Sequence, residues 1–163
     1  MIFSTNNTAP VVSSLDFRQL RAKLSDPVEG EGLDSAQLDL AEREYRRFLT
    51  LHLMHPTVSL VPNRLVDLFW HAHILDTAGY QRDCDRMFGY LLHHDPYLGM
   101  DGPASHHELE RMFSATLMLY EAHFGTYPLE QLSAVRCKGH ACHAPTPCRC
   151  RVPGACSSTG SVA

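Results

Sequence analysis

The sequence has little positive charge and no long apolar run. Its 163 residues include 14 Lys and Arg against 18 Asp and Glu, and the basic residues are scattered rather than gathered in a stripe. Such a stripe neutralises phosphates in nucleic-acid-binding proteins, so we expect no nucleic acid among the main partners. No stretch approaches the roughly 18 to 20 apolar residues that cross a bilayer, and we therefore expect no membrane contact.

Several common sequence signals are also missing. Residues 1–14 lack the basic start and the apolar stretch of a secretion signal, so we expect a cytoplasmic protein. The chain has no Gly-rich phosphate loop, no Gly-x-Ser-x-Gly elbow and no His-Glu-x-x-His pair. The commonest nucleotide-binding and hydrolase classes therefore lose support.

The pattern that is present is helical. Apolar residues recur at spacings of three and four, and no stretch shows a convincing strand pattern. The spacing predicts helices over about 15–24, 35–53, 64–88 and 105–124, with Asp34 or Ser35 as the cap of the second and His52 as a hydrogen-bonded core residue. We predict an all-α fold, a compact bundle of four to five helices at 15–133, with a flexible, disordered N-terminal arm at 1–14 and a Cys/His-rich C-terminal tail at 134–163.

The segment from Val66 to Asp76 sets two histidines and two carboxylates among large apolar side chains, around the only tryptophan of the chain. Burying such groups is costly unless each finds a partner. Residues two apart on a helix point in nearly opposite directions, so His71 and His73 cannot bind one ion from a regular helix. Asp67 and His71, four apart, share a face. One histidine then serves a site and the other a structural bond.

A second source of ligands is the run from His93 to Pro96, which we expect to form a turn aimed back at the central helix. Imidazoles and carboxylates that converge in this way suit a transition metal, namely zinc, iron or copper. The alternative is a polar core without a metal, in which Asp67 accepts a hydrogen bond from His71. For the metal site we predict ligands among Asp67, His71, His73, His93 and His94, and we expect Trp70 and Tyr80 to contact a bound cofactor.

The tail contains five of the six cysteines, with two histidines between them. Their spacing lacks the paired Cys-x-x-Cys knuckles of zinc fingers, yet thiolates favour Cu(I) or zinc, so a metal-loading segment is one interpretation. The other is a disordered tail whose thiols stay reduced. The candidate ligands of the tail are Cys137, His140, Cys142, His143, Cys148, Cys150 and Cys156.

The central motif continues as Trp70-His71-x-His73, Tyr80, Asp83-Cys84 and then His94-Asp95. In this order it resembles the glycine-rich domain-containing protein-like family of plants, fungi and bacteria, over residues 35–127. The family has no assigned biochemical activity, so the resemblance implies only that Asp67, Trp70, His71, His73 and His94 matter.

Two functions fit these observations. The first is a small metal-binding protein with a His/carboxylate site; whether it is also an enzyme stays open, and activation of water or O₂ on a small molecule or peptide is the chemistry that such a site would suit. The second is a non-catalytic interaction or metal-handling module that uses the tail. Both are open at this point.

Overall fold

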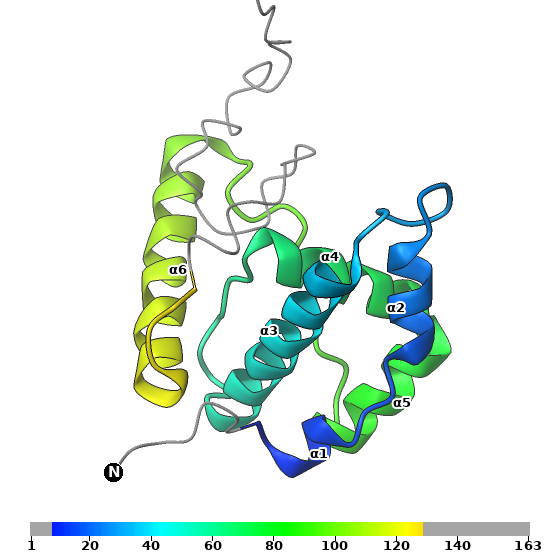
Figure 1. Ribbon diagram of the computed structural model, residues 1–163. Coiled ribbons are helices and arrows are strands. Elements are labelled where there is room, and N and C mark those ends of the chain that lie inside the picture. Colours follow the sequence, from blue (N-terminus) through cyan, green and yellow to red (C-terminus); the bar gives the residue numbers. More distant parts are fainter. Residues whose placement is uncertain (1–7, 129–163) are drawn as a thin grey trace, which may run out of the picture.

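The computed structural model describes residues 8–128, which form helices joined by loops and contain no strand (Figure 1). The predicted all-α fold, a compact helical bundle, is confirmed. None of the helices in this part of the chain is long and apolar enough to cross a membrane. The helices are α1 (Pro10–Ser13), α2 (Arg18–Ser25), α3 (Ser35–Met54), α4 (Arg64–Leu75), α5 (Thr77–Phe88) and α6 (Gly102–Phe124).

Helix α3 lies at the centre of the bundle and packs against α1, α2, α4 and α6. Figure 1 shows α6 on one side of it and α1, α2 and α5 on the other. The helix starts at a capping box, in which Asp34 accepts from the Gln37 amide at 2.8 Å and Gln37 accepts from the Asp34 amide at 3.0 Å. The backbone N–H groups of both residues, which have no partner within the helix, are thereby hydrogen-bonded. The helix therefore begins where the sequence predicts.

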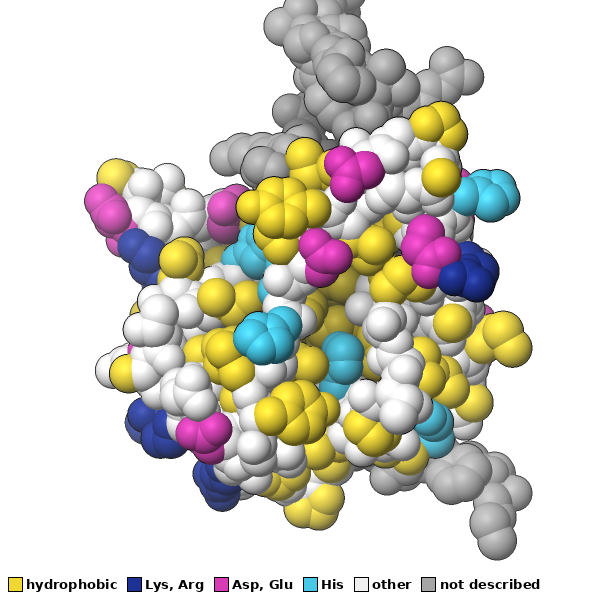
Figure 2. Space-filling model, turned by 180° about the vertical axis from the view of Figure 1, so that it is seen from behind, with side chains coloured by type: hydrophobic (Ala, Val, Ile, Leu, Met, Phe, Trp, Pro, Cys, Tyr) yellow, Lys and Arg dark blue, Asp and Glu magenta, His cyan; other side chains and the backbone are white. Residues whose placement is uncertain are grey.

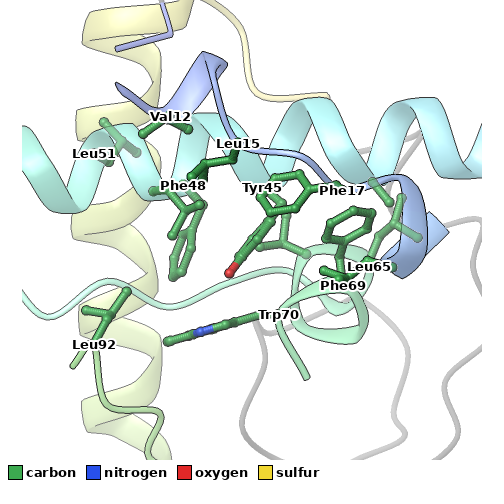
Figure 3. Packing of buried hydrophobic residues seen from close by; sticks show 14 of the residues in the cluster. Val12, Leu15, Phe17, Tyr45, Phe48, Leu51, Leu65, Phe69, Trp70 and Leu92 are labelled. Atoms are coloured by element: carbon green, nitrogen blue, oxygen red, sulfur yellow. The ribbon is translucent and has the colours of Figure 1, made fainter. Parts of the chain in front are cut away.

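Aromatic side chains fill the space between α3 and α4 (Figure 3). Phe17 and Tyr45 both lie 5.3 Å, centroid to centroid, from Phe69, and Phe48 lies 5.2 Å from Trp70. All five are buried. Since α4 also packs on α2 and α5, it is held on several sides and offers a rigid base for its polar side chains.

The single helix predicted over 64–88 is two helices. Asp76 ends α4, and its carboxylate accepts from the Gly79 amide at 3.1 Å as the N-cap of α5. A side chain at Gly79 would meet this carboxylate, because an added Cβ would lie 2.3 Å from Asp76 Oδ2. The apolar periodicity continues through the break, so the sequence pattern gives no sign that one helix ends and another begins at Asp76. The turn lets α5 pack back on α4.

The ends of the bundle also differ from expectation. Residues 8–14, which were assigned to the flexible arm, include α1, and Val12 is fully buried. Arg46 holds this segment by donating to the Val12 and Leu15 carbonyls. Helix α6 begins at Gly102, earlier than predicted, and Ser105 in its first turn accepts from the Gly99 amide at 2.9 Å. The tail at 134–163 lies outside the described residues.

Most buried polar groups are paired, but His52 is not. Glu44, for example, accepts from Tyr120 at 2.7 Å and from Arg47 at 3.0 Å, which ties α3 to α6. Within residues 8–128, His52 Nε2 is the one buried side-chain nitrogen or oxygen without a hydrogen-bond partner. The prediction of a fully hydrogen-bonded core histidine is therefore wrong, because this nitrogen has no partner. The ring is packed edge-on against Phe48, at 4.7 Å, and burial lowers its pKa from 6.5 to about 4.

His52 should make the protein less stable in mild acid. The unfolded chain takes up a proton at His52 near pH 6.5 and the folded chain only near pH 4, so stability is lost as the pH falls through this window. The loss from this residue amounts to about 3 kcal/mol at most. Urea unfolding at a series of pH values should show a smaller decrease for His52→Leu than for the wild type. Equal slopes would contradict the assignment.

Candidate metal centre

Helix α4 places Asp67 and His71 one turn apart on the same face. The helix begins at Asn63, whose side chain accepts from the Val66 amide at 2.9 Å. Asp67 therefore lies in the first turn, where the helix dipole favours a carboxylate. Its side chain is only 4% exposed, whereas that of His71 is 40% exposed. The pair thus presents one buried ligand and one that solvent reaches.

The third member, His94, comes from the loop between α5 and α6. Tyr80 positions this loop, because its hydroxyl accepts from Trp70 Nε1 at 2.9 Å and donates to the Leu92 carbonyl. The His94 ring then packs at 4.7 Å from the Trp70 ring. One tyrosine on α5 thereby connects the indole of α4 to the loop and brings His94 back to the face of Asp67.

Three atoms with lone pairs meet at this point. His94 Nε2 lies 2.9 Å from Asp67 Oδ1 and 3.0 Å from His71 Nε2, and the remaining side of the triangle is 3.5 Å. A proton on His94 Nε2 can point directly at only one of the other two atoms. If both imidazoles carried a proton on Nε2, the two hydrogens would face each other. A cation at the centre would satisfy all three atoms at once.

These separations match those between ligands of one metal ion. Metal–nitrogen and metal–oxygen bonds of about 2.0 to 2.2 Å put neighbouring ligands about 3.3 to 3.6 Å apart in a tetrahedron and about 2.8 to 3.1 Å apart in an octahedron. The observed 2.9, 3.0 and 3.5 Å span both geometries. The group Asp67, His71 and His94 is the one cluster of at least three such ligands in the described part of the chain.

His73 is not part of this group and lies on the other side of α4. It is buried, with Nδ1 at 2.9 Å from the Tyr45 hydroxyl and Nε2 at 3.2 Å from Asp83. Burial lowers the pKa of His73, against the opposing effect of Asp83. A neutral ring then donates from Nε2 to the carboxylate and accepts from Tyr45 at Nδ1. His73 therefore serves as a hydrogen-bonded link between α3, α4 and α5.

The other predicted residues have different surroundings. His93 is exposed and lines a pocket together with Trp70, and it does not join the three-atom group. Trp70 and Tyr80, which were expected to contact a cofactor, are bonded to each other and hold the loop of His94. The seven tail residues from Cys137 to Cys156 lie outside the described residues.

A groove beside His71 was not foreseen from the sequence. It has a volume of about 510 Å³, and its lining includes Leu20, Leu24 and Leu75 as well as the acidic Glu29 and Glu31. Leu75 ends α4, but the other four residues come from α2 and the loop after it, far from α4 in the sequence. No local pattern links a Pro/Gly-rich loop to a histidine forty residues away, so only the fold reveals this side of the site.

Replacing Tyr80 by phenylalanine should destabilise the protein by about 2 to 3 kcal/mol. The change leaves the buried Trp70 N–H and the Leu92 carbonyl without their shared partner. Urea denaturation measures the effect. Tyr90→Phe is a matched control, because Tyr90 is 47% exposed and its loss of a hydroxyl should cost less than about 0.5 kcal/mol. Equal losses in the two variants would show that the Tyr80 link does not hold the loop.

Comparison with known proteins gives one match. The model of the UCP032817-like family matches residues 11–118, which include all three members of the centre. No curated protein and no solved structure matches the chain. The resemblance to the glycine-rich domain-containing protein-like family is wrong, because the family model that matches is a different one and carries no assigned activity. Since the match spans well over half of its length, the chain belongs to the UCP032817-like family.

Proposed function

We propose that the protein binds a divalent transition-metal ion, zinc or iron(II), and uses it to act on a small molecule or peptide. The ligands would be Asp67 Oδ1, His71 Nε2 and His94 Nε2. The observation that carries the proposal is the convergence of these three atoms within 3.5 Å of one another, from two segments 27 residues apart.

The types of ligand support this choice of metal. Two imidazoles and one carboxylate resemble the ligand sets of catalytic zinc sites and of the non-haem iron(II) oxygenases. Both leave at least one coordination position for water, O₂ or substrate. A zinc-bound water has a pKa near 7, so such an ion supplies hydroxide at neutral pH or polarises a carbonyl as a Lewis acid.

The burial of the three ligands gives the direction of access. The Asp67 and His94 side chains are 4% and 9% exposed, against 40% for His71. A reactant would therefore approach from the His71 side, where the groove lies. Glu29, Glu31 and Asp76 outnumber the single Lys23 in its lining, and four leucines give it apolar walls. This lining suits a neutral or cationic substrate with an apolar group.

Loss of one ligand should remove one metal equivalent. We expect the full-length chain, loaded with zinc and dialysed, to retain one equivalent more than His71→Ala or His94→Ala by elemental analysis. His107→Ala is the matched control, because the His107 side chain is 90% exposed, and it should retain the wild-type content. Identical contents in the wild type and His94→Ala would refute the site.

The same comparison separates the helical site from the tail. Thiols outside the described residues contribute equally to all of these variants, so the difference between variants isolates the centre. Cobalt(II) gives a second readout, because thiolate ligands produce strong charge-transfer absorption in the near ultraviolet and imidazole or carboxylate ligands do not. The cobalt(II) equivalent that the wild type binds and His71→Ala does not bind should lack this absorption. Its presence would place the ion on cysteines.

Metal binding should also stabilise the fold. An ion held by α4 and the loop of His94 binds the folded chain, and at a free concentration of a hundred times its Kd it raises the free energy of unfolding by about 2.7 kcal/mol. Urea unfolding with zinc and with a chelator measures this gain. His94→Ala should show little of it, because its remaining ligands come from one helical turn. A gain of the same size in both proteins would contradict the proposal.

A further inference from the structure

The two imidazoles of the metal centre are not oriented for a straight hydrogen bond to each other. His71 Nε2 lies 3.0 Å from His94 Nε2, and the centres of the two rings are 4.6 Å apart. In a straight hydrogen bond of this length the ring centres would be about 5.3 Å apart, because each centre lies about 1.15 Å behind its nitrogen. The observed spacing instead matches two nitrogens that point at one ion at a right angle, for which bonds of about 2.1 Å give about 4.6 Å.

A second histidine pair has the geometry of a hydrogen bond. His55 follows the last residue of α3 and His123 lies in the last turn of α6; their Nε2 atoms are 2.9 Å apart and their ring centres 5.1 Å apart. The nitrogens thus face each other almost head-on, as a donor and an acceptor do. At nearly the same separation of nitrogens, the rings of His71 and His94 are turned differently.

The three separations in the centre also indicate its coordination geometry. With bonds of about 2.1 Å, the distances of 2.9 and 3.0 Å correspond to angles of about 90° at the ion, and 3.5 Å corresponds to about 110°. A tetrahedral site would have all three angles near 110° and the ring centres about 5.3 Å apart. Two right angles and a ring spacing of 4.6 Å fit a distorted octahedron, in which the three ligands share one face.

Three adjacent positions of this octahedron remain for small ligands. The centre has a hollow on either side, since His71 lines the groove of about 510 Å³ and His94 lines a pocket of about 310 Å³. Figure 2 shows a hollow near the middle of the face opposite to that of Figure 1, with histidine side chains in and beside it and apolar side chains around it. Because Asp67 and His94 are deeply buried, this arrangement suits water and diatomic molecules, which need no wide opening.

The geometry also favours one of the two proposed ions. Two histidines and one carboxylate on one face, with open positions, form the ligand set of non-haem iron(II) sites that react with O₂, whereas zinc favours the tetrahedron. Zinc binds a given set of ligands more tightly than iron(II) does, so geometry is one of the means by which a protein selects iron. We infer that the metal centre holds six-coordinate iron(II) and takes up O₂ as a ligand. The inference rests on the proposed metal site and specifies its ion and one of its reactants.

Nitric oxide tests the uptake of a diatomic ligand, because it binds iron(II) in the position of O₂ and gives the complex an electron-spin signal. We expect the full-length protein, loaded with iron(II) under argon, to form the quartet-spin complex of iron with nitrogen and oxygen ligands. Iron on thiolates forms a doublet-spin dinitrosyl complex instead, which separates any iron bound by cysteines. His71→Ala should lose the quartet signal, and its fold should persist because this side chain is 40% exposed. His123→Ala, which breaks the hydrogen-bonded pair, is the matched control and should keep the signal.

Cobalt(II) tests the geometry, since the six-coordinate ion absorbs visible light weakly and the four-coordinate ion much more strongly. With both proteins saturated, the spectrum of the wild type minus that of His71→Ala isolates the centre. We expect this difference to show only the weak bands, and His123→Ala to give the same difference as the wild type.

The outcomes distinguish this inference from the proposed function. Strong four-coordinate bands in the cobalt(II) difference, or bound iron that forms no quartet complex with nitric oxide, would overturn the inference and leave a metal centre of the zinc type. A quartet signal that survives in His71→Ala would also overturn it, because the iron would then lie elsewhere. Equal metal contents in the wild type and His71→Ala would refute the centre itself, and the proposed function with it.

Discussion

The hydrogen bonds from Trp70 to Tyr80 and from Tyr80 to Leu92 are the interactions on which the convergence of Asp67, His71 and His94 depends. They connect α4, α5 and the following loop through one hydroxyl in a place that solvent does not reach. The loop has no regular structure of its own between residues 89 and 101, so its position relative to α4 rests on such contacts. The position of this loop determines where His94 lies. It therefore sets the distances from His94 to Asp67 and His71, and it places His94 in the wall of a neighbouring pocket.

The histidines of the core show two ways of burying the same side chain. His73 has a partner on each ring nitrogen, and its environment holds α3, α4 and α5 together. His52 is also buried, but its Nε2 has no partner among the described residues. The first arrangement stabilises the fold, whereas the second lowers its stability. The two residues are alike in sequence context, since each belongs to an apolar helical stripe, so only their spatial neighbours separate the roles.

Much of the fold follows from periodicity and caps. The spacing of apolar residues predicted the ends of α2, α3 and α6 to within three residues, and the opposite directions of His71 and His73 followed from helical geometry before any contact was known. What periodicity could not reveal was the break at Asp76, because the apolar pattern continues through it. The unpaired nitrogen of His52, the hydrogen bond from Tyr80 to Leu92 and the groove beside α2 depend on how distant segments pack, and no local pattern encodes that packing.

The junction between α4 and α5 has a further consequence for how the chain can vary in length. One residue, Asp76, both ends the first helix and caps the second, so no flexible linker lies between Trp70 and Tyr80. Adding or deleting a residue there would rotate one helix by about 100° relative to the other and turn the tyrosine away from the indole. The loops after α3 and α5 have no comparable constraint at their exposed tips. Insertions and deletions in this lineage are therefore expected in those loops and excluded from the ten residues that join the two aromatic rings.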